Sequence, residues 1–159
     1  MEIRTFEPTD TQQVVQLILP IQTEEFGIPI TLEDQPDLLD IPHFYQQQKG
    51  NFWVATAEGQ VVGTLALLDI GNQQGALRKM FVHPDFRGKP HGSAQKLLDG
   101  LLDWARTQGL TEIFLGTTAK YLAAHRFYEK NGFVQIEPDA LPAAFPRMQV
   151  DTRFYQIRV

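Results

Sequence analysis

The stretch Leu77–Ala94, LRKMFVHPDFRGKPHGSA, decides the fold of this 159-residue chain. Its first six residues are mostly apolar and predict a β-strand over 77–82. Gly, Pro and charged residues follow over 83–91 and predict a loop, and from Gly92 or Ser93 leucines recur at helical spacing up to Gly109. A strand, a loop and a helix therefore follow one another directly. The unpaired N–H groups that begin such a helix favour an anionic group such as a phosphate.

The same region is locally basic in an acidic chain. Residues 78–96 carry five Lys or Arg and one Asp, although the chain as a whole has a net charge of -5. Arg87 and Lys89 add positive charge beside the expected helix start. From these residues alone, a phosphate-bearing ligand is supported about as well as an ordinary Gly- and Pro-rich turn with solvated basic side chains. Both standard glycine motifs for nucleotides are absent.

Apolar periodicity predicts further elements on both sides of this stretch. Before it the sequence predicts a strand over 2–6, a helix burying Val14, Leu17, Ile18 and Ile21, short helical pieces from Thr31, and a hairpin of 51–57 and 60–68 turned at Glu58-Gly59. After it the sequence predicts a strand over 112–116, a helix over 121–131 ending at Asn131-Gly132, and strands over 133–136 and 149–159. This order predicts one α/β domain with a mixed sheet over residues 1–159.

Composition excludes several classes of chemistry. The chain has no Cys, so it has neither a disulfide nor a cysteine nucleophile, and its four His lack paired ligand spacing, so no metal site is expected. A pI near 5.3 argues against a nucleic-acid partner. No apolar run approaches the ~20 residues of a membrane span. We therefore expect a cytoplasmic protein without nucleic-acid or membrane partners.

Two segments resemble a known family. Residues 77–94 resemble the acetyl-CoA motif of the GNAT superfamily of N-acetyltransferases, whose core is Gln/Arg-x-x-Gly-x-Gly/Ala. Residues 124–133, AHRFYEKNGF, resemble the family's second signature, a helix ending in Phe/Leu-Tyr-Glu-Lys-x-Gly-Phe. The resemblance implies a single N-acetyltransferase domain over residues 1–159. Its GNAT-like fold would have a twisted, mostly antiparallel sheet with one splayed parallel strand pair, flanked by about four helices.

The resemblance also implies roles for individual residues. The backbone of Phe81 and Val82 would bind the pantetheine arm and the acetyl carbonyl of acetyl-CoA, and Tyr128 would protonate the leaving thiolate. The pyrophosphate would lie against Arg87, Gly88, Lys89, Pro90, His91, Gly92 and Ser93. Two positions depart from the family pattern. Pro90 replaces the motif's first glycine and lacks an N–H group, and Tyr121 stands where many members have an asparagine that contacts the cofactor.

These inferences predict an acetyl-CoA-dependent N-acetyltransferase that acts on a primary amine of a small molecule or peptide. Without Cys, direct attack in a ternary complex is the simpler route. The alternative is a non-catalytic regulatory module that binds CoA or an acyl-CoA.

The general base stays open among Glu24, Glu25, Asp69, His83 and a water chain. Residues 24–40 carry six carboxylates and no Lys or Arg, which suits a cationic acceptor or an ordinary solvated surface, and edge strands are compatible with a homodimer.

Overall fold

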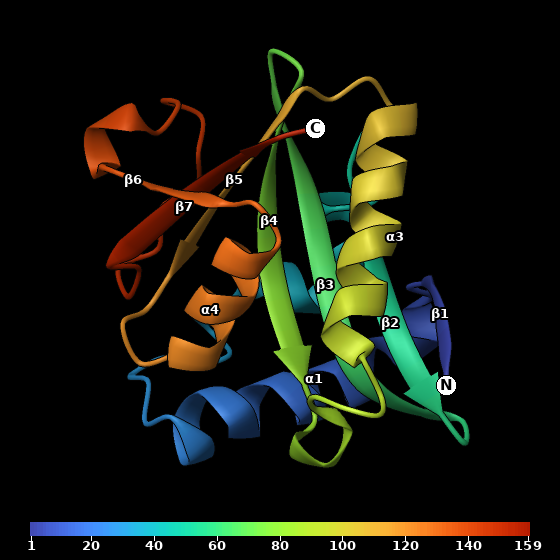
Figure 1. Ribbon diagram of the computed structural model, residues 1–159. Coiled ribbons are helices and arrows are strands. Elements are labelled where there is room, and N and C mark those ends of the chain that lie inside the picture. Colours follow the sequence, from blue (N-terminus) through green and yellow to red (C-terminus); the bar gives the residue numbers. More distant parts are fainter.

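A seven-stranded sheet forms the centre of the computed structural model, which describes all 159 residues (Figure 1). The strands lie in the order β1-β2-β3-β4-β5-β7-β6, and every neighbouring pair is antiparallel except β4 and β5. Their bounds are β1 (Glu2–Thr5), β2 (Asn51–Ala57), β3 (Gln60–Gly71), β4 (Gln74–Val82), β5 (Glu112–Thr117), β6 (Val134–Ile136) and β7 (Arg153–Arg158). The predicted fold, a mostly antiparallel sheet with one parallel pair, is confirmed.

Two tight turns set the register of the central strands. Glu58 and Gly59 have φ angles of 52° and 77°, as a two-residue hairpin turn between β2 and β3 requires. Asn72 and Gln73, with φ of 56° and 62°, make an equivalent turn between β3 and β4. Because this second turn lacks glycine at its two central positions, the sequence pattern missed it. The strand β4 consequently begins at Gln74 instead of Leu77.

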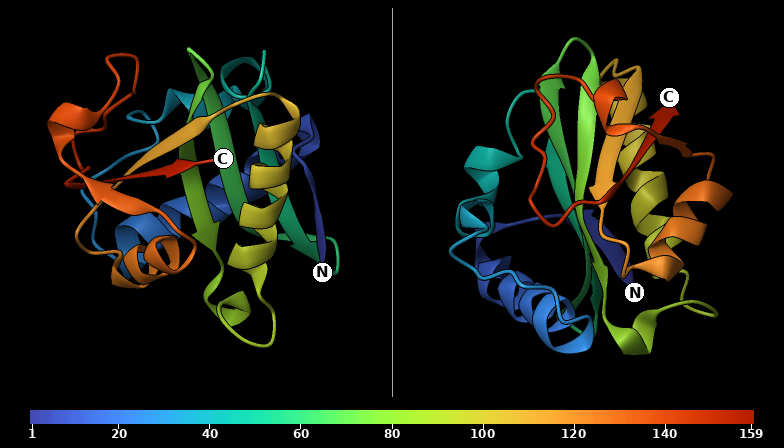
Figure 2. Two further views of the ribbon diagram at one scale, coloured as in Figure 1. Left: turned by 45° about the horizontal axis from the view of Figure 1, so that its top comes forward. Right: turned by 90° about the vertical axis from the view of Figure 1, so that its left-hand side faces the viewer.

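Helices cover both faces of the sheet (Figure 2). The helix α1 (Thr11–Pro20), its π-helical continuation Ile21–Glu25 and the short α2 (Ile41–Phe44) pack on one face, and α3 (Ser93–Thr107) and α4 (Leu122–Lys130) pack on the other. Four single 3-10 turns, Pro8–Asp10, Pro36–Leu39, Pro84–Phe86 and Pro138–Ala140, complete the regular structure. None of the helices has both the length and the apolar character needed to span a membrane.

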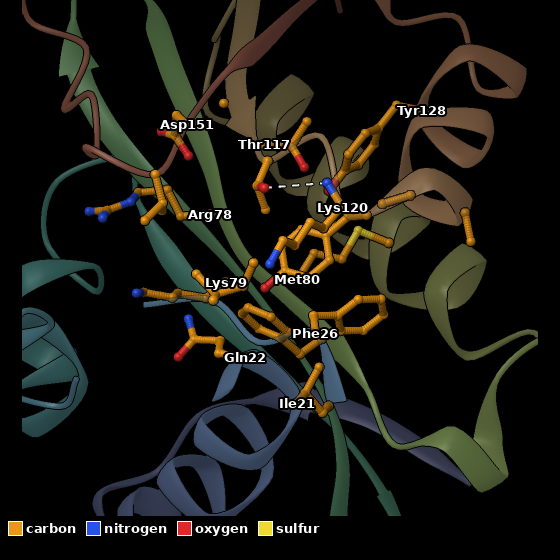
Figure 3. A pocket seen from close by; sticks show the side chains of 18 of the residues that line it. Ile21, Gln22, Phe26, Arg78, Lys79, Met80, Thr117, Lys120, Tyr128 and Asp151 are labelled. Carbon is orange, nitrogen blue, oxygen red and sulfur yellow. Dashed lines mark hydrogen bonds between the residues drawn. The ribbon is translucent and has the colours of Figure 1, made fainter. Parts of the chain in front are cut away.

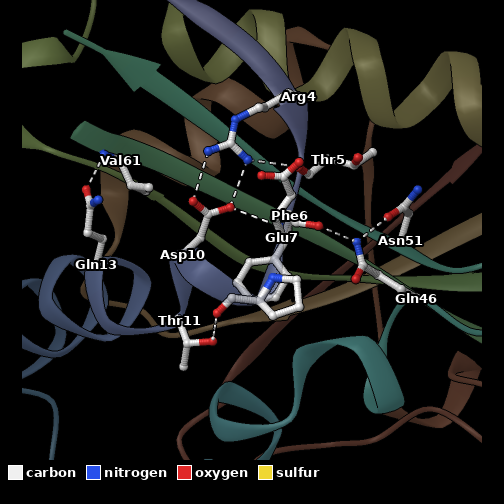
Figure 4. A network of polar contacts seen from close by, with 11 residues as sticks. Arg4, Thr5, Phe6, Glu7, Asp10, Thr11, Gln13, Gln46, Asn51 and Val61 are labelled. Atoms are coloured by element: carbon white, nitrogen blue, oxygen red, sulfur yellow. Dashed lines mark hydrogen bonds and ion pairs between the residues drawn. The ribbon is translucent and has the colours of Figure 1, made fainter. Parts of the chain in front are cut away.

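A polar network anchors the start of α1 to the sheet (Figure 4). Both terminal nitrogens of Arg4 donate to the carboxylate of Asp10, at 2.8 and 2.9 Å, and the Glu7 N–H donates to the same carboxylate at 2.9 Å. These hydrogen bonds hold the pKa of Asp10 below its ordinary value. The Val61 N–H of β3 donates to the Gln13 side chain at 2.8 Å. The helix is thereby fixed against β1 and β3, which sets where its far end meets β4.

Two predicted boundaries change for local reasons. Thr31 and Asp34 exchange hydrogen bonds as a capping pair does, but they close a turn, and the short helical pieces begin only at Pro36. The last strand begins at Arg153 instead of Gln149. Ahead of it the chain turns tightly, because the Asp151 N–H donates to the Met148 carbonyl at 3.0 Å and the Met148 N–H donates to the Asp151 carboxylate at 3.1 Å.

Candidate active site

The strands β4 and β5 separate part-way along their length and open a cavity. They pair only from Gln74–Ala76 with Glu112–Phe114. A bulge contributes to the separation: between the pairs Thr64–Phe81 and Ala66–Arg78, β4 carries one residue more than β3, and Lys79 has a φ of 56°. Beyond Ala76 the facing backbone edges of β4 and β5 are unpaired. They border a cavity of about 610 Å³ (Figure 3), a size typical of small-molecule sites.

The cavity runs along β4 between two ends of different character. Arg87 and Gly88 line it beyond Val82, and we name this the Val82 end. The other end, named the Arg78 end, is lined by Arg78, Lys79, Gln22, Met148 and Asp151. Most residues between the two ends are hydrophobic. The cavity therefore joins two polar regions through an apolar middle.

The Val82 end has a set of free backbone donors. Five of the residues predicted at the site, Phe81, Val82, Arg87, Gly88 and Tyr128, line the cavity itself, whereas Lys89, Pro90, His91, Gly92 and Ser93 continue the loop outside its lining. The N–H groups without an acceptor in the protein are those of Gly88, Lys89, His91, Ser93, Ala94 and Gln95. Together with the N-terminus of the 15-residue helix α3, they form a cradle suited to an anion.

The conformations of Pro90 and Gly92 leave the free N–H groups of this loop available. Pro90 follows a cis peptide bond and supplies no N–H group. Gly92 has a φ of 62° at the helix start, and its N–H donates to the Gly88 carbonyl at 3.0 Å. The Ser93 hydroxyl donates to the Phe86 carbonyl at 2.9 Å. Gly92 and the Ser93 hydroxyl thus shape the loop, while the backbone of its neighbours stays free for a ligand.

Arg87 connects the loop to the far end of α1. Its Nε donates to the Val82 carbonyl at 2.8 Å, and its terminal nitrogens donate to the Glu25 carboxylate at 2.5 and 2.7 Å. This pairing holds the pKa of Glu25 below its ordinary value. The guanidinium carbon of Arg87 also lies 6.0 Å from the centre of the Phe26 ring. Arg87 is therefore held by groups of the protein at the place where the sequence predicts a phosphate contact.

Tyr128 presents an unpaired hydroxyl to the cavity. Its ring packs against Phe133 and Tyr155, with centroids 5.5 and 5.9 Å away. The hydroxyl has no hydrogen-bond partner in the protein, yet it is not sealed off from the cavity that the residue lines. Burial raises the pKa of Tyr128. The phenol therefore stays protonated over the whole neutral range and has its proton available for a ligand.

Tyr121 takes an apolar role where the family often has an asparagine. Its ring packs edge-on against Phe26 and Phe81, at centroid distances of 4.9 and 6.2 Å. Burial raises the pKa of Tyr121 to about 12. The three rings bring together α4, the continuation of α1 and β4, so this residue packs the middle of the cavity.

None of the four side chains considered as general base, three carboxylates and one imidazole, lines the cavity. Glu25 is paired with Arg87, Asp69 accepts the N–H groups of Lys49 and Gly71, and Glu24 and His83 lie elsewhere. The carboxylate that does line the cavity is Asp151, which no pattern in the sequence indicates. It belongs to no motif, and only the fold of the loop before β7 brings it to the site.

A glycine on β5 makes room for Asp151. A Cβ atom at Gly116 would lie 2.6 Å from Oδ2 of Asp151 and 2.8 Å from its Cγ. Real Cβ atoms do not approach so closely, so this carboxylate needs glycine beneath it. Burial raises the pKa of Asp151, against the opposing effect of Arg78, Lys79 and Arg147.

The β4 bulge turns two basic residues toward the same side. Arg78 lies over the Tyr45 ring, its guanidinium carbon 6.0 Å from the centroid. The ammonium of Lys79 donates to Gln35 at 2.5 Å and lies 3.6 Å from Asp37, which also accepts the Tyr45 hydroxyl at 2.5 Å. Asp37 thus balances the charge of Lys79. Arg78 has no ion-pair partner, and its hydrogen bond goes to the Met148 sulfur at 3.2 Å.

The acidic stretch 24–40 does not supply free charge to the cavity. Of its six carboxylates, Glu25 pairs with Arg87 and Asp37 pairs with Lys79. None of the six lines the cavity. The structure therefore gives no support to the expectation that this stretch attracts a cationic acceptor.

Comparisons with known proteins agree with this arrangement. An acetyltransferase of the GNAT family from Staphylococcus aureus superposes with a TM-score of 0.96 at 37% identity, over 99% of this chain and 98% of that chain. An acetyltransferase from Streptococcus agalactiae gives a TM-score of 0.94 at 36% identity, again over 99% and 98% of the two chains. The N-acetylaspartate synthetase of Xenopus tropicalis is 37% identical over 128 residues, which are 77% of this chain and 46% of that protein. The chain thus spans less than half of this curated relative.

The family itself follows from a match that covers most of the chain. The family profile described as "Acetyltransferase (GNAT) family" matches residues 15–133. This range includes the β4–loop–α3 unit, β5 and α4, the elements that surround the Val82 end. The chain therefore belongs to the GNAT acetyltransferase family.

Proposed function

We propose that this protein is an N-acetyltransferase that transfers the acetyl group of acetyl-CoA to a primary amine of a small molecule. One observation carries the proposal: the unpaired edge of β4, the residues Gly88 and Ala94 with their free N–H groups, and Tyr128 with its free hydroxyl all line one cavity. The family uses acetyl-CoA. The name of the Xenopus relative, N-acetylaspartate synthetase, supports a small-molecule acceptor.

The residues of the Val82 end fit the chemical groups of acetyl-CoA. The free N–H groups of Gly88, Lys89, His91, Ser93 and Ala94 suit a pyrophosphate, which accepts hydrogen bonds at each oxygen. The edge of β4 that β5 leaves unpaired ends at Phe81 and Val82, and it suits the amide groups of a pantetheine arm, which pair with a strand edge as another strand would. When bound, acetyl-CoA supplies an activated acyl group as a thioester.

Tyr128 is suited to assist the departing sulfur. A thiol has an ordinary pKa of about 8.5, so a thiolate leaving at neutral pH is stabilised by a hydrogen-bond donor. The raised pKa of Tyr128 keeps its phenol in the donating form. Since the hydroxyl has no partner within the protein, it is free to turn to the sulfur.

The acceptor reacts directly, because the chain has no cysteine to carry the acetyl group. The amine nitrogen bonds to the acetyl carbon while the carbon–sulfur bond breaks. This requires an amine that has lost its proton before attack and an acceptor held beside the thioester. We expect the Arg78 end, the part of the cavity away from the loop, to hold the acceptor and to accept the proton of its amine.

The first test is binding followed by turnover. We expect CoA and acetyl-CoA to raise the melting temperature, and acetyl-CoA to release free thiol in the presence of a suitable amine. Ala94→Glu places a carboxylate among the free N–H groups and should weaken CoA binding more than the neutral, equally long Ala94→Gln. No shift with CoA would overturn the proposal. Binding without thiol release from any amine would favour the non-catalytic CoA-binding module.

A further inference from the structure

The carboxylate of Asp151 lacks a cationic partner inside the cavity. Its Oδ2 accepts the Met148 N–H at 3.1 Å, and no Lys or Arg lies within ion-pair distance. It is the one carboxylate among the residues that line the cavity. A carboxylate that is partly withdrawn from water in this way gains stability from a cationic ligand. A protonated amine is such a ligand.

Asp151 also lies within reach of the expected chemistry. Burial is the main cause of the raised pKa of Tyr128 and Tyr121, and the charge of Asp151 adds to it at both residues. Asp151 lies against Gly116 of β5, and Gly116, Thr117 and Tyr128 line the same cavity (Figure 3). Asp151 therefore lines the same cavity as the residue that we expect to assist the leaving sulfur.

Arg78 provides the opposite charge at the same end. Its guanidinium has five N–H donors and uses one of them, on a thioether, which is a weak acceptor. Met148 joins the two groups: its sulfur accepts from Arg78 and its N–H donates to Asp151. The charge of Lys79 is already balanced by Asp37. The free charges of the Arg78 end are thus one guanidinium and one carboxylate.

This pair of charges excludes a polycation and matches a zwitterion. Basic residues that line the cavity are Arg78, Lys79, Arg87 and Lys120, against the one carboxylate, so a polyamine would meet mostly like charge. A molecule with one ammonium and one carboxylate satisfies both free groups. An arginine fork binds a carboxylate through two parallel hydrogen bonds.

We propose that the Arg78 end is an acceptor subsite for an amino acid, in which Asp151 receives the amine and Arg78 binds the carboxylate. The inference rests on the proposed acetyl transfer. The acceptor ammonium gives one proton to Asp151, and the neutral nitrogen then bonds to the acetyl carbon. As the carbon–sulfur bond breaks, the sulfur takes the proton of Tyr128, and the nitrogen's second proton returns to the phenol. Asp151 finally releases its proton to water, leaving an N-acetylated amino acid and free CoA.

The first arm of the test compares acceptors on the wild-type protein. L-Leucine, L-phenylalanine and L-aspartate are assayed with acetyl-CoA, each beside its α-carboxamide. We expect at least one amino acid to be acetylated with a kcat/KM about tenfold or more above that of its carboxamide, since a hydrogen-bonded charge is lost. Equal or better turnover of the carboxamides would overturn the inference while leaving acetyl transfer in place. Release of no thiol from any amine would overturn both, and the melting shift with CoA would show whether the cofactor still binds.

The second arm tests the two residues. Asp151→Asn keeps an oxygen for the Met148 N–H and should lower kcat/KM at pH 7 by about 10²- to 10⁴-fold. The deficit should shrink as the pH passes the pKa of the acceptor amine, because the amine then arrives already neutral. Asp151 interacts electrostatically with the charged and titratable groups of Arg78, Lys79, Arg147, Tyr121 and Tyr128, and all of them remain in this variant.

Arg78→Met should remove the preference for the amino acid over its carboxamide and raise KM more than it lowers kcat. Matched controls are Asp139→Asn and Arg126→Met, which alter exposed residues away from the cavity. Calorimetric titration of the CoA-bound protein with the preferred amino acid supplies a readout without turnover. A deficit in Asp151→Asn that is the same at every pH, or an unchanged preference in Arg78→Met, would overturn the assignment of that residue.

Discussion

Replacing Glu25 with Gln is expected to tighten the binding of CoA. Both terminal nitrogens of Arg87 are held by the Glu25 carboxylate, and its Nε is held by the Val82 carbonyl. If Arg87 binds the pyrophosphate, it must first give up Glu25. Glu25→Gln removes the charge that competes with the ligand while keeping the shape of the side chain.

The size of the effect follows from the exposure of the ion pair. The side chains of Arg87 and Glu25 are 36% and 33% exposed, and a pair of this kind contributes about 0.5–1 kcal/mol. Since about 1.4 kcal/mol corresponds to a tenfold change in affinity, the Kd of CoA should fall about two- to fivefold. Isothermal titration with CoA at low ionic strength measures this, and the gain should diminish as salt screens the ion pair.

Glu24 offers a matched control one residue away. It is exposed and has no ion pair, so Glu24→Gln removes the same net charge without freeing Arg87. Equal gains in Glu24→Gln and Glu25→Gln would show a general charge effect and refute the reasoning. A gain from Glu25→Gln that persists in an Arg87→Ala background would refute it as well, because the benefit must pass through Arg87.

Three further results are expected. Tyr128→Phe should lower kcat by about 10²-fold or more at unchanged Kd for CoA, measured by thiol release and titration; full turnover would return Tyr128 to a packing role. Gly116→Ala should push the Asp151 carboxylate aside, lowering kcat/KM and costing about 1–3 kcal/mol of stability in chemical denaturation; an unchanged kcat/KM would show that the placement of Asp151 does not matter. Burial lowers the pKa of Lys79 to about 8, below an unfolded value of about 10.4, so the unfolded state binds more protons between these pH values. Stability should therefore rise with pH in that window relative to Lys79→Met, and parallel curves for the two proteins would contradict this assignment.

Local sequence signals were sufficient where one element follows another in the chain. The β4–loop–α3 unit was predicted because its apolar strand, its Gly and Pro residues and its leucine spacing all lie within some thirty residues of one another. The turn at Asn72-Gln73 was missed because two residues other than glycine adopt a positive φ there. The spacing of Thr31 and Asp34 predicts the start of a helix, but the same reciprocal hydrogen bonds also close an isolated turn, which is what they do here.

The residues of the Val82 end could be predicted from the sequence, whereas most residues of the Arg78 end could not. Residues of the Val82 end lie on one continuous loop, so a motif can record them. The Arg78 end combines Gln22, the bulged segment of β4 and Asp151, which are far apart in the chain. Asp151 reaches the cavity only because the chain turns at Met148 and because Gly116 leaves space. No local pattern encodes such a meeting of distant segments.

The charge pattern of the sequence acquires a different meaning in three dimensions. Two ion pairs join the acidic stretch to the basic stretch: Glu25 with Arg87 near the Val82 end, and Asp37 with Lys79 near the Arg78 end. The first pair holds the continuation of α1 against the loop after β4, and the second holds the segment before α2 against β4, so these four charges join elements of the fold. Two charges stay uncompensated at the Arg78 end of the cavity: Arg78, from the basic stretch, and Asp151, from outside both stretches, which are joined through Met148. A net sum over either stretch would predict a strongly charged ligand, whereas the uncompensated pair selects a molecule that carries one charge of each sign.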